Sequence, residues 1–435
     1  MTHRIVILLT GASIGGLLAS SAFAEDQAPA AAAPAAAAPA PPSPALQPFS
    51  DAWVKTVKLS GHVEVGGTVN PTSPKNGINF GSLFTDKSNT ALLNSAAMTL
   101  ERDLDPKSTG FDLGFKVQGY FGSDARFTHF IGEFDRSLNE LNQFDIVEAN
   151  VVAHLPVLTA GGIDVKIGQF STPIGAEVID PTGDFFYSHD YIFNFGIPFK
   201  HTGILTTTHV NPILDVYAGY TTGVNTSIGH GGGSNNAQFH FLGGIGLNLN
   251  KLTVLAFTHI GPEDPAGSLG PGVDVHSKLR YIFDGLATYK FNDKLTSITE
   301  INYIHDDGFS ASGGGVAQYL TYALTPVITA GVRGEVWRDA QGFFVAAFPG
   351  NLDYARAAVG SPNGAYGAGP ATYGAITVGL NIKPPHLPKI IDGTVIRPEI
   401  RYDRALAGGT PFNGNPGIDK GQFTIAVDLV APITF

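Results

Sequence analysis

Segments of about ten residues, in which apolar and polar side chains alternate strictly, recur along most of this chain. In residues 57–69 the apolar set is Val57, Leu59, Val63, Val65 and Val69, and the polar set is Lys58, Ser60, His62, Glu64 and Thr68. Since successive strand side chains point to opposite faces, one face of such a strand meets an apolar medium and the other meets water. The alternation predicts an all-β chain of two-faced strands.

We count about sixteen such segments. They lie near residues 57–69, 92–103, 110–121, 145–155, 162–170, 201–210, 213–223, 238–250, 252–260, 278–291, 294–305, 315–325, 327–338, 372–384, 393–404 and 421–435. Short turns alternate with long loops that cover residues 70–90, 122–144, 171–200, 224–237, 261–277, 306–314, 339–371 and 405–420. Short periplasmic turns and long extracellular loops are typical of transmembrane antiparallel β-barrels with an even number of strands.

The N-terminal residues predict export. Arg4 precedes an apolar stretch that ends at Ala22-Phe23-Ala24, a small-x-small cleavage pattern, so we interpret residues 1–24 as a signal peptide. A retained membrane helix is the alternative. Residues 25–48 are nearly all Ala and Pro and predict a disordered periplasmic spacer, or else a low-complexity remnant without a role. The folded part is then residues 49–435.

Composition excludes several classes of protein. The chain has no Cys, which rules out disulfides, thiolate catalysis and Cys-based metal sites. Its net charge of −11 argues against a nucleic-acid partner. No spacing among its 13 His residues compels a metal site, so we expect neither a metal nor another cofactor. After the leader there is no apolar run long enough for a transmembrane helix, which leaves a closed barrel as the way to span a membrane.

Two strands carry features specific to a membrane barrel. The apolar face of 281–291 reads Tyr281, Phe283, Gly285, Ala287, Tyr289 and Phe291, so aromatic rings flank a small-residue centre. Projected on the barrel axis, a tilted strand of this length spans about 25 Å, which is the height of the lipid-facing band between two aromatic girdles. The last segment alternates up to Phe435, as in the C-terminal strands that the barrel-assembly machinery recognises. Outer-membrane lipid and that machinery are therefore the expected partners.

The central part of the chain resembles a known family. The quoted residues are Gly168-Gln169-Phe170, Pro173-Ile174-Gly175, Glu177-Val178-Ile179-Asp180, Phe185-Phe186-Tyr187-Ser188, Tyr191, Phe193-Asn194, Pro198-Phe199 and His201-Thr202-Gly203. This pattern resembles the central motif of the OmpL-like β-barrel porins, and residues 333–339 and 397–403 resemble their later strands. The resemblance covers roughly residues 50–435 and implies a barrel in the outer membrane of a Gram-negative envelope, with pore activity. Residues 224–237 depart from it, because relatives tend to carry an Asp-containing turn there.

Charged side chains on the polar strand faces are the first candidate site. They are Arg333, Glu335, Arg397, Glu399, Arg401, Asp403, Lys116, Lys166 and Arg280. An Arg on the lipid face near the midplane would cost about 2–4 kcal/mol, so we expect these groups to face water in the lumen. They would then impose a field that selects among polar solutes. The alternative is wall solvation with cross-strand ion pairs, which carries no selectivity.

The loop 171–200 is the second candidate, because it is unusually aromatic for an exposed segment. The residues singled out are Glu177, Asp180, Asp184, Phe185, Phe186, Tyr187, Asp190 and Tyr191. We expect the loop to fold into the barrel and narrow the pore, as the third loop does in general porins, with its carboxylates facing the Arg side chains across the lumen. Packing against the rim or a neighbouring subunit is the alternative.

These features favour a porin for passive, weakly selective diffusion of small polar solutes. A barrel enzyme is one alternative, but no compact nucleophile–base set stands out, so we expect no catalytic residues. A surface-binding, adhesive barrel without a conducting pore and a soluble periplasmic binding protein are the others. A homotrimer is expected by analogy with general porins.

Overall fold

The computed structural model describes residues 46–105, 108, 110–135, 139–226, 238–264, 275–358 and 363–435. The predicted signal peptide and residues 25–45 of the predicted spacer lie outside these described residues. Most of the predicted loop 224–237 and the turn near Pro106 also lie outside them.

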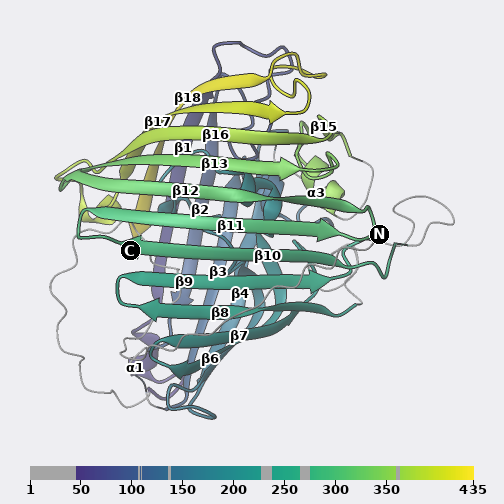
Figure 1. The fold of residues 1–435 in the computed structure, drawn as a ribbon. Coiled ribbons are helices and arrows are strands. Elements are labelled where there is room, and N and C mark those ends of the chain that lie inside the picture. Colours follow the sequence, from purple (N-terminus) through teal and green to yellow (C-terminus); the bar gives the residue numbers. More distant parts are fainter. Residues whose placement is uncertain are drawn as a thin grey trace.

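Within the described residues, sixteen strands form one closed barrel (Figure 1). They are β1 (Lys58–Val69), β2 (Thr90–Arg102), β3 (Asp112–Gly122), β4 (Gln143–Leu155), β5 (Ile163–Ser171), β6 (Lys200–Asn211), β7 (Leu214–Thr221), β8 (His240–Leu249), β9 (Leu252–Gly261), β10 (Arg280–Lys290), β11 (Leu295–Asp306), β12 (Ala311–Thr325), β13 (Ile328–Asp339), β16 (Ala371–Ile382), β17 (Val395–Ala407) and β18 (Gly421–Thr434). Neighbouring strands are antiparallel, and β1 pairs with β18 from Ser60↔Thr434 to Val69↔Ile425, which closes the ring. The predicted all-β fold, an antiparallel barrel, is confirmed.

The two faces of the strands differ as the alternation predicts. In β1, Val65 points outward and is 46% exposed, whereas its neighbour Glu64 points inward and is 4% exposed. Alternation in the segment 145–155 predicts that Val147 points outward with Ala149 and Val151, and this prediction is wrong. Val147 is buried, because a β-bulge shifts the register between β3 and β4: Gln118 pairs with Glu148 and Gly119 with Ile146, which leaves Val147 as the extra residue.

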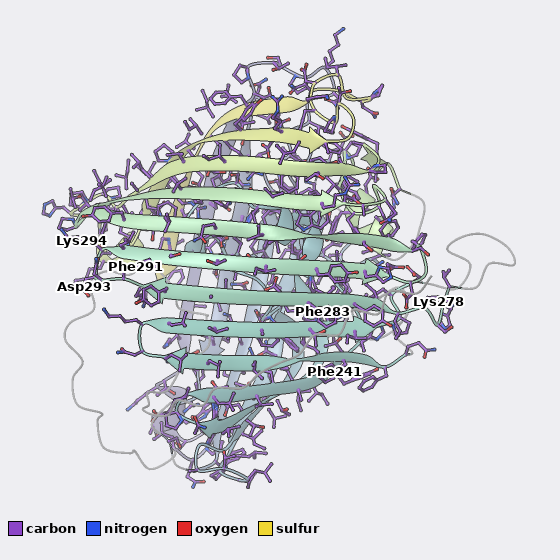
Figure 2. All side chains as sticks on the ribbon, in the orientation of Figure 1. Phe241, Lys278, Phe283, Phe291, Asp293 and Lys294 are labelled. Carbon is purple, nitrogen blue, oxygen red and sulfur yellow. The ribbon has the colours of Figure 1, made fainter. Side chains whose placement is uncertain are left out.

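The aromatic girdle predicted for 281–291 is present on the outer face of β10. Figure 2 shows Phe291 at the end of the barrel with short turns and Phe283 towards the end with long loops. Both rings are outward and exposed, as is Tyr289. An exposed apolar outer surface with rings at two heights suits contact with a bilayer and its two interfaces.

Small elements occupy the connections. They are the helices α1 (Asp51–Val54), α2 (Ala125–Thr128) and α3 (Asp353–Ala358), the 3-10 turns η1 (Pro181–Gly183) and η3 (Lys389–Ile391), the π-helical turn η2 (Ile192–Gly196) and the two-stranded sheet of β14 (Ala346–Ala347) and β15 (Tyr366–Gly367). The barrel proper thus begins at Lys58, and α1 precedes it, with the Trp53 indole donating to the Leu113 carbonyl at 3.0 Å. Among the described residues, no helix is long and apolar enough to cross a bilayer.

The core of the molecule lies inside the barrel, towards its long-loop end. Rings from several long loops pack together there, including Phe84 with Phe193 (centroids 5.4 Å apart) and Phe199 with Tyr354 (5.7 Å). Phe84, Phe193 and Phe199 are buried and belong to one hydrophobic cluster, and the partly buried Tyr354 packs against it. Aromatic contacts of this kind let irregular loops fold as a compact unit within the strands.

Candidate functional site

The segment between β5 and β6, residues 172–199, is named the third loop here. It leaves the wall at Ser171 and returns at Lys200. In the ring of strands β13 lies seven places from β6, and β17 lies six places from β5. Contacts with these two strands mean that the third loop crosses the barrel interior to the opposite side.

The charged wall is the set of inward side chains that meets the third loop there: Arg333 and Glu335 of β13 with Arg397, Glu399, Arg401 and Asp403 of β17. All six belong to the predicted site, and alternation along two strands places all six on the inner face. Ion pairs between strands hold the charged wall together, such as the pair of Arg401 Nη1 with Glu335 Oε1 at 2.9 Å.

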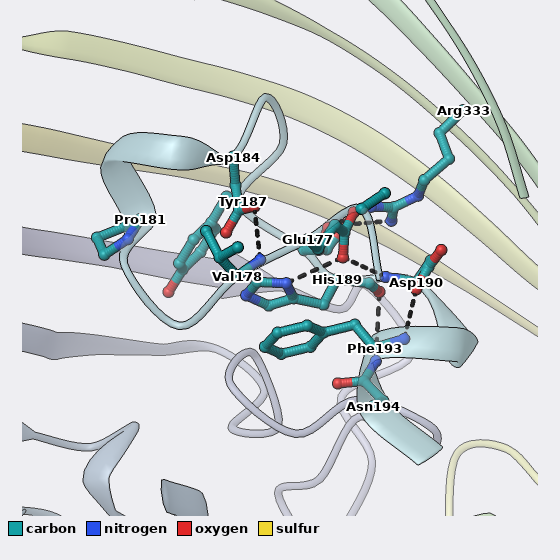
Figure 3. A network of polar contacts seen from close by, with 12 residues as sticks. Glu177, Val178, Pro181, Asp184, Tyr187, His189, Asp190, Phe193, Asn194 and Arg333 are labelled. Atoms are coloured by element: carbon teal, nitrogen blue, oxygen red, sulfur yellow. Dashed lines mark hydrogen bonds and ion pairs between the residues drawn. The ribbon is translucent and has the colours of Figure 1, made fainter. Parts of the chain in front are cut away.

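Arg333 is the main link between wall and loop (Figure 3). Its Nη1 lies 2.6 Å from Glu177 Oε1 and donates to the Ser188 carbonyl at 2.6 Å. Glu177 also accepts from the Asp190 backbone N–H at 2.9 Å, and its Oε2 lies 2.9 Å from His189 Nδ1. One guanidinium thus holds two separate parts of the third loop, at Glu177 and at Ser188.

Carboxylates of the charged wall bind backbone N–H groups of the loop. Glu399 accepts from Tyr187 N at 2.9 Å and from Ser188 N at 3.2 Å, and Glu335 accepts from Tyr191 N at 2.7 Å. These are strong charge-assisted bonds, and they satisfy donors that a buried irregular segment could not otherwise pair.

The first part of the loop is held by Arg397. Its Nη1 donates to the carbonyls of Pro181 (2.9 Å) and Asp184 (2.8 Å), while Nη2 binds Glu64 at 3.0 Å. Asp180 pairs with His62 of β1 at 3.4 Å. The predicted loop residue Asp184 therefore meets the charged wall through its backbone.

The aromatic residues of the loop pack on the same wall. Phe185 lies against Gly331, and the Phe186 ring lies 5.1 Å from the Arg333 guanidinium. Tyr191 stacks on Tyr373 with centroids 5.0 Å apart and donates to Asp403 at 3.2 Å. Separately, the Tyr187 hydroxyl donates to Asn94 of β2 at 2.8 Å.

The expectation that the charged wall faces water is wrong. Arg333 is 0% exposed and Glu335, the most accessible of the six, is only 6% exposed. The loop carboxylate Glu177 touches Arg333 directly and does not face it across an open lumen. The physical reason is that the third loop is long enough to cross the interior and apolar enough to displace the water between the two.

Lys116, Lys166 and Arg280 also point inward but have other partners. Lys116 lies 3.7 Å from Glu101, Arg280 pairs with Asp306 at 2.7 Å, and the Lys166 ammonium lies 5.8 Å from the Phe170 ring. The Lys116 side chain stays 21% exposed, so this part of the wall is hydrated to a degree that the charged wall is not.

A second polar row crosses β4 to β7 near the short turns. We call it the histidine–aspartate row: His154, Asp164, His209 and Asp215. Asp164 lies 2.7 Å from His154 and 3.2 Å from His209, which lies 2.8 Å from Asp215. These side chains are between 9% and 24% exposed. Across the described residues, no group of three or more His, Asp or Glu is arranged to hold a metal ion.

The ionisation of the loop carboxyls follows from their partners. Burial raises the pKa of Glu177, but Arg333 and His189 outweigh it and bring the pKa down to about 2. Burial together with Glu177 and Glu335 raises the pKa of Asp190 well above its ordinary value. Burial and Glu177 likewise raise the pKa of Asp184. The pKa values of neighbouring carboxyl groups in one loop are thus shifted in opposite directions.

Several residues that hold the loop are absent from the sequence-based prediction. The Tyr319 hydroxyl of β12 lies 2.9 Å from both Glu177 and Asp190, and Lys200, where the loop ends, donates to Asp145 at 2.7 Å. The signal for Tyr319 is a lone Tyr on the inner face of its strand. The Lys200–Asp145 pair joins distant segments and has no such local signal.

Comparisons with known proteins agree with this architecture. A family model described as "Putative beta-barrel porin-2, OmpL-like" matches residues 56–433. No curated protein matches the chain in sequence. The structure is similar to that of OmpF from Salmonella typhi in complex with daunomycin, with a TM-score of 0.53, 10% identity and coverage of 87% of this chain and 97% of that chain. It is also similar to an anion-selective porin from Comamonas acidovorans, with a TM-score of 0.52, 11% identity and coverage of 87% and 99%.

Proposed function

The chain belongs to the OmpL-like family of outer-membrane β-barrel porins, and from that premise we propose that it gives passive, weakly selective diffusion of small hydrophilic solutes. Family and fold favour a non-enzymatic channel. The short turns then lie on the periplasmic side and the long loops outside the cell.

The observation that carries this proposal is the third loop tied across the barrel interior. Its link from Glu177 to Arg333 and its bonds to Glu335 and Glu399 leave less of the cross-section for solutes. In this proposal the charged wall anchors the constriction, because buried and paired charges cannot make direct contact with a passing solute.

Selectivity is then proposed to arise on the opposite wall, whose charged side chains are partly exposed. The groups there are Lys116, Lys166 and the histidine–aspartate row. They mix both signs of charge on hydrated strands, and water screens each of them, which fits weak rather than strict selection.

We further propose two partners besides outer-membrane lipid: the barrel-assembly machinery and other copies of this chain. Phe435 directly follows β18 and is 67% exposed, and we propose that the barrel-assembly machinery recognises it. A homotrimer remains the expected assembly. Native mass measurement in detergent, before and after heating, tests it.

Single-channel recording in a planar bilayer tests the function. We expect steady open steps whose size scales with salt concentration, and a small shift of reversal potential in a salt gradient. A purified, folded barrel that gives no conductance would contradict the pore and favour the surface-binding alternative. Selectivity as strict as that of a dedicated ion channel would contradict the weakly selective mode.

A further inference from the structure

The Tyr319 hydroxyl of β12 sits between two carboxyl groups of the third loop. It lies 2.9 Å from Glu177 Oε1 and 2.9 Å from Asp190 Oδ2. The Tyr319 side chain is buried. No water is needed to join these three groups, since each distance is that of a direct hydrogen bond.

A phenolic hydroxyl has one proton to donate, whereas an ionised carboxylate only accepts. Two ionised carboxylates on one hydroxyl would therefore leave one close contact between two acceptors. For both contacts to be full two-centre hydrogen bonds, one of the two carboxyl groups must carry a proton and donate it to the Tyr319 oxygen.

The surroundings decide which group is protonated. Glu177 accepts hydrogen bonds from the Arg333 guanidinium at 2.6 Å and from the Asp190 N–H at 2.9 Å, so the negative charge of its carboxylate is compensated. The only donor to Asp190 Oδ1 among the described side-chain bonds is Phe193 N, at 2.7 Å. Burial and the carboxylates around it raise the pKa of Asp190. Asp190 therefore keeps the proton, which forms the chain Asp190–OH to Tyr319–OH to Glu177.

We propose that Tyr319 is a positioning residue that fastens the third loop to the barrel wall through this proton, so that the docked loop is released when Asp190 ionises. The proposal rests on the proposed pore, in which the third loop is the constriction. Release would widen the lumen and raise the conductance.

The direction of the pH effect follows from linkage. The docked state binds the proton more tightly than an undocked Asp190 exposed to water, so rising pH favours undocking, by about tenfold per pH unit between the two pKa values. The groups that act on Asp190 are Glu177 of the loop, Glu300 of β11, Tyr319 of β12, and Arg333 and Glu335 of β13. Two further groups lie next to these: His189 is bonded to Glu177, and Arg401 of β17 donates to the His189 carbonyl. Those that carry a negative charge add to the effect.

The test compares Tyr319→Phe with Tyr373→Phe. Tyr373 lies on β16 and packs on the same loop through Tyr191, and its buried hydroxyl has no hydrogen-bond partner among the residues that the structure describes. Both variants remove one hydroxyl from the same interface. We expect Tyr319→Phe to raise the population of the wide state about tenfold at neutral pH, the size expected for one lost buried hydrogen bond, and Tyr373→Phe to match the unmodified protein.

Asp190→Asn supplies the readout that a merely structural contact would not move. The amide donates to Tyr319 at every pH and still accepts from Phe193 N, so the variant should stay docked and lose the pH dependence. Conductance from about pH 5 to 9 and hydrogen exchange of residues 172–199 in detergent follow the same transition independently. Retention of the pH dependence in Asp190→Asn, or equal behaviour of the two Tyr variants, overturns the inference. A barrel without conductance at any pH counts against the pore, while hydrogen exchange still decides whether the loop docks through this proton.

Discussion

The charged wall and the histidine–aspartate row use similar residues on inward strand faces, yet they differ in what covers them. Arg333 is completely buried beneath the third loop, whereas His209 of the row keeps 24% of its side chain exposed. Buried charges hold the loop through direct bonds, and the partly exposed row can meet ions and water. The same alternation pattern therefore supplies an anchor on one side of the barrel and a solute-facing wall on the other.

The largest expected effect comes from removing the anchor. Arg333→Ala leaves Glu177 buried without its guanidinium, and breaking a buried ion pair in this way costs about 3–5 kcal/mol. We expect faster hydrogen exchange throughout the third loop and a lower unfolding temperature in detergent. Arg338→Ala is the matched control, because Arg338 lies on the same strand and is exposed. Equal effects of the two variants would contradict the role of the charged wall.

Acid should loosen the same anchor. The pKa of docked Glu177 is about 2, below its ordinary value of 4.5. Its contribution to docking is therefore complete above about pH 4.5 and is lost as the pH falls towards 2. Protease cleavage within residues 172–199 should become faster over this range. Glu177→Gln should flatten that part of the profile, and an unchanged profile would show that another group titrates.

A smaller effect is expected where the loop packs on a glycine. A methyl group at Gly331 would collide with the Phe185 ring, and at Gly334 on the same strand it would meet open space. Gly331→Ala should weaken docking by about 1–3 kcal/mol, as overpacking usually does. Gly334→Ala should leave both stability and loop exchange unchanged. Hydrogen exchange and thermal unfolding of the two variants measure the difference.

The smallest change in stability should come from the other side of the comparison. Asp164→Asn removes a charge that is 15% exposed but leaves an amide of the same shape that can still hydrogen-bond to a histidine, so the loss of stability should be about 1 kcal/mol. Its effect should instead appear in the reversal potential, which should shift towards anions because a negative charge is lost from the solute-facing wall. Asp293→Asn, in a short turn labelled in Figure 2, is the control. An unchanged reversal potential would place the solute path elsewhere.

Local pattern accounts for the barrel and for part of the site. All sixteen predicted strands are present, because the period of two is set by the backbone and each strand must separate lipid from the interior. Val147 is the exception on a face, since a bulge depends on the pairing of two strands and leaves no mark in one of them. The sequence also showed that the third loop is rich in aromatic residues, and this predicted that the loop packs against another surface.

The amino-acid sequence by itself determined which side chains of the regular strand segments point inward, because alternation fixes the face of each side chain wherever no bulge interrupts the pairing. Only the tertiary structure decided what those side chains meet. Whether Arg333 contacts water or Glu177 depends on where the third loop packs. This loop joins β5 and β6, whereas Arg333 lies on β13, on the opposite side of the barrel. Charge pairing, burial and the shared proton at Tyr319 are properties of that contact between distant segments, and no single segment contains them.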